Sequence, residues 1–227
     1  HKRIKRRVRS ALVLALVRLL APLPLPVALR LGGAVGALAY HLAGGTRRLT
    51  LRHLAIAFPE KDERERAVIA RATFVHLGLN ALELAAMSSF DGRLESYVEL
   101  SPPGLLREVI ARGRGMVFVT GHLGSWELLA RRIARAGIPN AFIAKRGGDE
   151  GLNGLAERFR AGGGVATLWR GDPATGRAII GTLRQGKALG VLIDQDTKVQ
   201  GVFVPFFGKE AFTPRAAADL ALRFGAP

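Results

Sequence analysis

The sequence contains no cysteine among its 227 residues, which excludes disulfide bonds, thiolate catalysis and cysteine-ligated metal sites within this chain. Aromatic residues make up only 7% of the chain, too few to favour the stacking surfaces that bind single-stranded nucleic acids. There is also no uninterrupted run of about twenty apolar residues, the length that one membrane-spanning helix needs. The remaining composition, 48% hydrophobic, is that of a globular chain long enough for one α/β core.

Acidic residues are missing from the start of the chain, where the first is Glu60, and the formal net charge is +16. Basic residues gather at the N-terminus instead: Lys2, Arg3, Lys5, Arg6, Arg7 and Arg9. An apolar region follows from Ala11 to Leu42, interrupted by two arginines and three prolines: Arg18, Arg30, Pro22, Pro24 and Pro26. Basic residues beside an apolar segment are typical of an anchor on an anionic membrane surface.

We therefore expect residues 1–45 to form a membrane-anchoring segment, a broken pair of helices lying in the interface. Two alternatives remain, a secretory signal peptide and a buried helical hairpin of a soluble domain. The excess of positive charge also favours an acidic carrier protein as a partner, and no nucleic acid is expected.

Residues 46–227 are expected to form one α/β domain. A connector over 46–60 leads to a long helix from Asp62 to about Ser88, because Asp62 and Glu65 have the spacing of a capping box. The apolar residues of this helix recur at steps of three and four and predict a single buried stripe: Val68, Ala72, Val75, Leu79 and Leu82.

From Gly113 onward, apolar strand patterns alternate with helical ones, which indicates a mainly parallel central sheet flanked by helices. The strands are predicted at 116–120, 141–144, 165–169, 189–193 and 202–204. The helices are predicted near 125–136, 150–161, 174–185 and 213–224.

Polar side chains follow four of these strands. His122 follows the first, Arg146 the second, Arg170 the third and Asp194 the fourth. Ligands of open parallel sheets bind beyond the carboxyl ends of the strands. A base, two cations and a carboxylate are therefore expected along one edge of the sheet.

The strongest local signal is the spacing of His122 and Glu127, since it spans a strand end, a glycine-bracketed turn and a helix start. We expect Glu127 to hydrogen-bond the His122 ring and keep the far ring nitrogen unprotonated, as a general base for a hydroxyl requires. A core histidine satisfied by a carboxylate is the structural alternative. A metal pair is disfavoured because no further ligand lies nearby in sequence, and Ser125 fits a helix N-cap better than a nucleophile.

Two later segments stay open. Asp194-Gln195-Asp196 fits a metal site, a loop that holds an arginine, or an ordinary turn. The aromatic segment Phe203–Gly208 fits either core packing or the wall of an apolar chain-binding groove.

Together these segments resemble the bacterial late acyltransferases of lipid A biosynthesis, within the glycerolipid acyltransferase superfamily. Most of the chain is covered, and the resemblance rests on four blocks: Leu54–Glu60, Thr120–Glu127, Asp194–Asp196 and Phe203–Gly208, the last followed by Ala211 and Thr213. Arg146 and Arg160 fall where the family has arginines. The departures are His53 and Ser125, where asparagine is usual, and Gly147, where proline is common.

The resemblance implies transfer of a fatty acyl group from an acyl carrier protein or coenzyme A thioester to a hydroxyl of a lipid A precursor, without a cofactor or metal. It implies His122 as base and Glu127 as its orienting acid. Arg146, Arg160 and Arg170 would hold phosphates or carboxylates of the glycolipid head group, and Asp194 would orient one of these arginines. The expected location is the cytoplasmic face of the bacterial inner membrane.

Two rival functions remain. The same chemistry could act on a glycerophospholipid or a phosphatidylinositol mannoside, or the chain could be a non-catalytic module that binds membranes or polyanions. The family carries a further C-terminal region beyond the position of Pro227, so we expect this chain to be a fragment.

Overall fold

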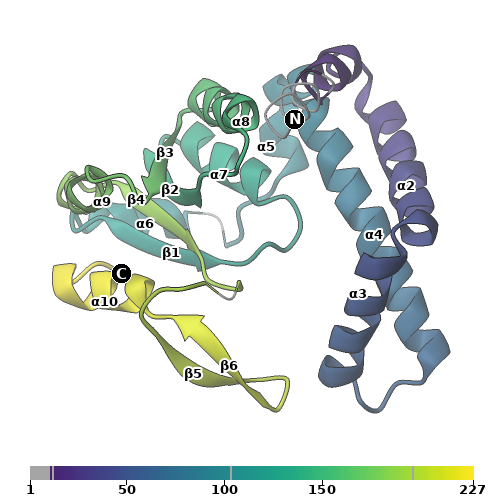
Figure 1. The fold of residues 1–227 in the computed structure, drawn as a ribbon. Coiled ribbons are helices and arrows are strands. Elements are labelled where there is room, and N and C mark those ends of the chain that lie inside the picture. The colour runs from purple at the N-terminus through teal and green to yellow at the C-terminus, as the bar shows by residue number, and fades with distance from the viewer. Residues whose placement is uncertain (1–10, 12, 103, 196) are drawn as a thin grey trace. The chain divides into compact units, whose positions relative to one another are not determined.

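The computed structural model describes residues 11, 13–102, 104–195 and 197–227. Its contacts divide the chain into two compact units. One unit contains Arg93–Val202 and Phe212–Pro227, and the other contains Leu16–Gly92 and Phe203–Ala211. Figure 1 labels the elements of both units.

The first unit is built on a four-stranded, wholly parallel sheet with the strand order β1-β4-β2-β3 (Figure 1). This confirms the α/β class with a central parallel sheet. The strands are β1 (Met116–Thr120), β2 (Asn140–Lys145), β3 (Val165–Arg170) and β4 (Ala188–Leu192), each within one residue of its predicted position at either end.

Helices cover both faces of this sheet. The helices of this unit are α5 (Leu94–Tyr97), α6 (Leu105–Ala111), α7 (Trp126–Arg135), α8 (Glu150–Gly162), α9 (Thr175–Arg184) and α10 (Ala216–Phe224). On one face, Ala130 of α7 packs in a buried cluster with Phe142 and Val165. On the other, Leu183 of α9 and Ala217 of α10 pack in a cluster that includes Leu189 and Val191.

The sheet opens between β2 and β4 at its carboxyl edge. β2 pairs with β4 only as far as Phe142 opposite Gly190. Beyond that point, β2 continues beside β3 to Lys145, and β4 continues beside β1 to Leu192. The two central strands therefore separate where a ligand of a parallel sheet is expected.

The second unit contains α2 (Leu25–Leu42), α3 (Gly44–Ala57) and α4 (Glu63–Ala85). The predicted capping box of α4 is confirmed, because the Asp62 side chain accepts from the Glu65 backbone N–H while the Glu65 side chain accepts from the Asp62 backbone N–H. The expected connector over 46–60 is wrong, since most of it forms α3.

Glycines set the packing of α4 against α2. A Cβ on Gly78 would lie 2.1 Å from the Gly32 carbonyl oxygen, so the two backbones approach as closely as only glycine permits. This contact turns the small side of α4 toward α2 and buries Ala70, Phe74, Gly78, Leu82 and Glu83. The predicted apolar stripe is confirmed at Leu82 and in part at Val75 and Leu79, which are half-buried beside Gly33 of α2. It is wrong at Ala72 and at Val68, which is 69% exposed.

The strand predicted at 202–204 exists but lies outside the parallel sheet. β5 (Gly201–Phe206) pairs with β6 (Lys209–Pro214) in a separate hairpin (Figure 1), and β6 occupies the start of the helix that was predicted from 213. Phe207 and Gly208 both have positive φ at the turn, as a two-residue hairpin loop of type I′ requires. Phe203 and Phe206 are 67% and 63% exposed, so neither is a core residue.

The broken helical pair expected near the N-terminus is present in the described part of that segment. Residues 13–20 are helical, a turn follows over 21–23, and α2 begins at Leu25 with Pro26 in its first turn. The basic residues Lys2 to Arg9 lie outside the described residues. Helices α2 and α4 are long and apolar enough to cross a membrane, a test of length and composition that core helices also pass.

Candidate active site

The strand order brings His122 together with Asp194. Thr120, the last residue of β1, lies directly opposite Leu192, the last residue of β4. His122 and Asp194 each come two residues after these strand ends. The Nδ1 atom of His122 lies 2.8 Å from Oδ1 of Asp194, and the backbone N–H of His122 donates to Oδ2 at 2.6 Å. One carboxylate therefore fixes both the ring and the backbone of the histidine.

Gly121 provides the space for this contact. A Cβ at this position would lie 3.0 Å from Oδ2 of Asp194 and 3.2 Å from its carboxyl carbon. A larger residue would push the carboxylate away from the His122 backbone. A glycine therefore precedes His122 because the segment that follows β4 approaches the backbone closely at this position.

The electrostatics assign the tautomer of His122. Partial burial raises the pKa of Asp194, but the hydrogen bonds from the His122 ring and backbone, together with the attraction of the ring, outweigh it, and the net pKa is lowered. An ionised carboxylate only accepts, so Nδ1 carries the proton and Nε2 keeps its lone pair. The Trp126 ring meets the imidazole edge to face at 4.7 Å. The imidazole is thus oriented, and its free nitrogen is that of a base.

The predicted pairing of Glu127 with His122 is wrong. Glu127 is bound by Arg160, whose Nε lies 2.9 Å from Oε2 and whose Nη2 lies 2.5 Å from Oε1. The pair joins the first turn of α7 to the last turn of α8, where each charge complements the dipole of its helix. The two side chains are only 14% and 15% exposed, so the ion pair is well shielded from solvent.

The arginines expected to bind a head group have different surroundings. Arg160 is occupied by Glu127. Arg146 stacks on the Trp169 ring at 4.7 Å and lies 3.4 Å from Glu150, outside the cavity wall. Arg170 lines the cavity. The expectation that Asp194 orients an arginine is wrong, because β4 places it beside β1 rather than beside β3.

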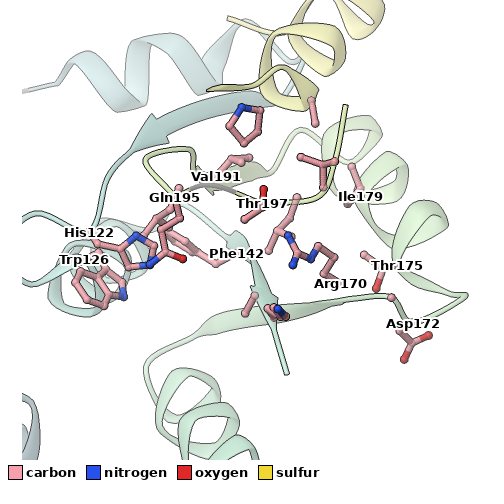
Figure 2. A pocket seen from close by; sticks show the side chains of 18 of the residues that line it. His122, Trp126, Phe142, Arg170, Asp172, Thr175, Ile179, Val191, Gln195 and Thr197 are labelled. Carbon is pink, nitrogen blue, oxygen red and sulfur yellow. The ribbon is translucent and has the colours of Figure 1, made fainter. Parts of the chain in front are cut away.

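A cavity of about 620 Å³ extends from His122 and is lined from both faces of the sheet. Figure 2 shows His122 and Trp126 at one end of it and Arg170, Asp172 and Thr175 toward the other. The other lining residues are mostly apolar and include Ala130, Phe142, Ile143, Ile179, Val191, Leu192, Val199 and Pro214. Its volume is in the range of ligand sites, about 300–1,000 Å³.

The cavity reaches both faces because β2 and β4 have separated. Phe142 and Leu192 contribute from the side of α7, and Ile143 and Val191 contribute from the side of α9 and α10. Gly190 leaves room for the Phe118 and Phe142 rings to pack against the strand, since a Cβ there would lie 2.6 Å from both.

Two site residues were missed by sequence reasoning. Lys145 lines the cavity beside Arg170, and Trp126 lines it beside His122. Lys145 ends its strand, so its place at the edge was a signal that could have been used. Within the described residues, no three side chains of histidine, cysteine, aspartate or glutamate gather as metal ligands would, and Asp196 lies outside that set.

The full chain, residues 1–227, matches the family described as bacterial lipid A biosynthesis acyltransferase. It is 28% identical over 195 residues to the lipid A biosynthesis lauroyltransferase of Escherichia coli (strain K12), covering 85% of this chain and 62% of that protein. It is 27% identical over 191 residues to the palmitoleoyltransferase of the same strain, covering 83% and 61%.

A relative with a different acceptor in its name also matches. The phosphatidylinositol mannoside acyltransferase of Mycolicibacterium smegmatis (strain ATCC 700084 / mc(2)155) is 27% identical over 201 residues, which are 86% of this chain and 65% of that protein. The chain therefore spans somewhat less than two thirds of the length of these curated relatives.

Proposed function

The chain belongs to the bacterial lipid A biosynthesis acyltransferase family, and from that premise we propose that it transfers a fatty acyl chain from a thioester donor to a hydroxyl of a lipid A precursor. The single observation that carries the proposal is the contact of His122 with Asp194 at one end of a largely apolar cavity. It combines an oriented base with a surface suited to an acyl chain.

The chemistry follows from the tautomer. Nε2 of His122 takes the hydroxyl proton as the oxygen attacks the thioester carbonyl carbon, and Asp194 stabilises the imidazolium that forms. The tetrahedral adduct then collapses, the carbon–sulfur bond breaks, and the thiolate leaves with the proton returned by the imidazolium. A base in this position typically contributes about 10²–10⁴-fold to the rate.

Glu127 and Arg160 act as positioning residues. Their shielded ion pair ties α7 to α8 beside the cavity and holds the helix that begins just after the His122 turn. Their contribution is therefore to the shape of the wall rather than to the protonation state of the imidazole.

The acyl chain would lie against the apolar wall, where Phe142, Val191 and Ile179 offer carbon surface and little competing hydrogen bonding. The donor is an acyl carrier protein or coenzyme A thioester, and the net charge of +16 would attract an acidic carrier. The basic N-terminus and the apolar helices α2 and α4 favour association with the cytoplasmic face of an inner membrane.

A second acceptor has support from one comparison. Similarity to the phosphatidylinositol mannoside acyltransferase favours a mannosylated inositol lipid as the alternative hydroxyl source for the same chemistry. Assays that offer each acceptor separately would distinguish the two.

The test is acyl transfer by the chain and by its His122→Ala variant, with the lipid products weighed by mass spectrometry. We expect the variant to lose at least a hundredfold in kcat while its circular dichroism and vesicle binding stay unchanged. Near-normal turnover by the variant would rule the mechanism out. Salt-dependent binding to polyanions with no acyl transfer by the unsubstituted chain would favour a non-catalytic module instead.

A further inference from the structure

Lys145 and Arg170 form a pair of cations at the edge of the sheet. Lys145 ends β2 directly opposite Arg170 at the end of β3, so their backbones are about 4.8 Å apart and both side chains leave the same face. Both line the cavity that begins at His122. The pair is therefore part of the cavity wall, with Arg170 half-buried and Lys145 exposed to solvent.

Neither cation is paired with a carboxylate in the part of the chain that the structure describes. Among the described residues, the side chains of Lys145 and Arg170 make no hydrogen bond or ion pair, whereas Arg160 is held by Glu127 and Arg146 by Glu150. Like charges on directly opposite residues of neighbouring strands repel one another. Such a pair is most stable when an anion lies between the two side chains.

The surroundings leave the pair positive. The two cations outnumber Asp172, which lines the cavity at the same end and whose carboxylate also accepts from the Ala174 backbone N–H at 2.8 Å. Helix α9 begins at Thr175 with no acidic residue in its first turn, and Thr175 and Gly176 also line the cavity. The positive end of this helix adds to the field of the two side chains.

We propose that Lys145 and Arg170 bind a phosphate group of the substrate, at the part of the cavity away from His122 (Figure 2). Guanidinium groups bind phosphate oxygens in pairs and ammonium groups bind them as point charges, so the two side chains are complementary in this role. The inference rests on the proposed acyl transfer for the identity of the ligand, but not for the existence of the phosphate site.

The ligand is then a phosphorylated amphiphile that reaches from the base, along apolar wall, to the cation pair. Two substrates of an acyl transfer have this chemistry. The donor carries a phosphate on its pantetheine arm, and a phosphorylated glycolipid acceptor carries phosphate on its sugar. Both sources place the same group between Lys145 and Arg170, and kinetics distinguish them.

Binding is tested first without turnover. The His122→Ala chain is titrated with coenzyme A and, separately, with glucosamine 1-phosphate, and each dissociation constant is compared with that of the same chain carrying Lys145→Ser and Arg170→Ser. We expect at least one probe to bind at least tenfold more weakly to the doubly substituted chain and to bind normally after Arg112→Ala, which removes a cation outside the cavity. Equal binding of both probes by all three chains would overturn the proposal.

Kinetics then identify the source of the phosphate. If the pair holds the donor, Arg170→Ala raises the KM of a phosphopantetheine thioester at least tenfold and leaves that of an N-acetylcysteamine thioester, which lacks phosphate, unchanged. If it holds the acceptor, the same variant raises the KM of the phosphorylated glycolipid but not of its dephosphorylated form.

The assignment would be overturned if Arg170→Ala raised the KM equally for the phosphorylated and the phosphate-free form of both donor and acceptor. Arg170→Lys keeps the charge but loses the paired contacts, so it should bind more tightly than Arg170→Ala and more weakly than the unsubstituted chain, which separates phosphate binding from a folding defect. If no chain transfers acyl groups but probe binding still depends on Lys145 and Arg170, the proposed function fails and the phosphate site stands.

Discussion

Replacing Asp194 with asparagine should disable His122 without changing the size of the side chain. In the structure, Oδ1 accepts from the ring Nδ1 and Oδ2 accepts from the backbone N–H. An amide has one oxygen, so one of these positions would receive an NH₂ group that can only donate. If the oxygen stays on the backbone, the NH₂ faces Nδ1 and favours the tautomer whose proton is on Nε2.

That tautomer cannot accept the proton of a hydroxyl. We therefore expect Asp194→Asn to lower kcat by about 10²–10⁴-fold, the usual contribution of a general base. The structural cost is smaller, about 1 kcal/mol in the free energy of unfolding, because the two side chains are 33% and 40% exposed. The assay is steady-state acyl transfer with saturating thioester donor, beside a thermal melt of each variant.

Glu127→Gln is the matched control, since it makes the same chemical change on the other acid of the site. It weakens the pair with Arg160 but leaves the imidazole and Asp194 in place. At low pH the rate of the wild type should fall because the general base becomes protonated, and we expect Glu127→Gln to show the same fall. The reasoning would be refuted if Asp194→Asn stayed within about threefold of wild-type kcat, or if Glu127→Gln alone abolished that fall.

The same contact makes a prediction about stability and pH. Because the pKa of Asp194 is lowered in the folded chain, its contribution is fully present above the ordinary value of 3.8 and is lost as the pH falls through the lowered value. The free energy of unfolding should therefore drop over that acidic range by more in the wild type than in Asp194→Asn. Parallel denaturant titrations at pH 3 and pH 6 measure it, and equal drops would contradict the assignment.

Three glycine substitutions test the packing around the site and in the helical unit. Gly121→Ala should displace the Asp194 carboxylate and lower kcat at least tenfold with little change in Tm; unchanged kcat would mean that the carboxylate tolerates the methyl group. Gly190→Ala places a Cβ 2.6 Å from the ring of Phe142 and should cost about 1–3 kcal/mol in unfolding free energy, with an unaltered denaturant midpoint as the contrary result. Gly78→Ala should push α2 and α4 apart and lower the Tm of the second unit by several degrees. A thermal melt followed by circular dichroism measures this change, and an unshifted Tm would contradict the prediction.

The elements of the parallel sheet could be predicted from sequence because each strand is a short apolar run bounded by turn residues. β1 (Met116–Thr120) was predicted to the residue, and the polar residues after the strands were correctly expected at one edge. The class of fold follows from this alternation alone. The order of the strands does not, because it depends on which buried faces fit together.

Because the strand order cannot be predicted, the acid that contacts His122 was assigned incorrectly. Glu127 lies five residues from His122, and local reasoning pairs the two. Asp194 lies 72 residues away and becomes a neighbour only because β4 inserts beside β1. Strand insertion is a tertiary choice that no local pattern records.

The helical unit was harder to predict for a different reason. Large apolar residues usually mark the buried side of a helix, but α2 and α4 meet through glycines, which carry no hydrophobic signal. Val68 is consequently exposed while Gly78 is buried. The hairpin that holds Phe207 was missed because its turn places a phenylalanine at positive φ, where glycine or asparagine is expected.

The ring nitrogens of His122 offer the most direct test of the central claim, that Asp194 holds the proton on Nδ1 and leaves Nε2 as the base. The measurement is the ¹⁵N spectrum of labelled imidazole groups at a pH where the ring is neutral, with the His122 signals assigned by their loss in His122→Ala. We predict a protonated Nδ1 and an unprotonated Nε2, with the pattern disturbed by Asp194→Asn and preserved in Glu127→Gln. A proton found on Nε2 in the unsubstituted chain would contradict the account.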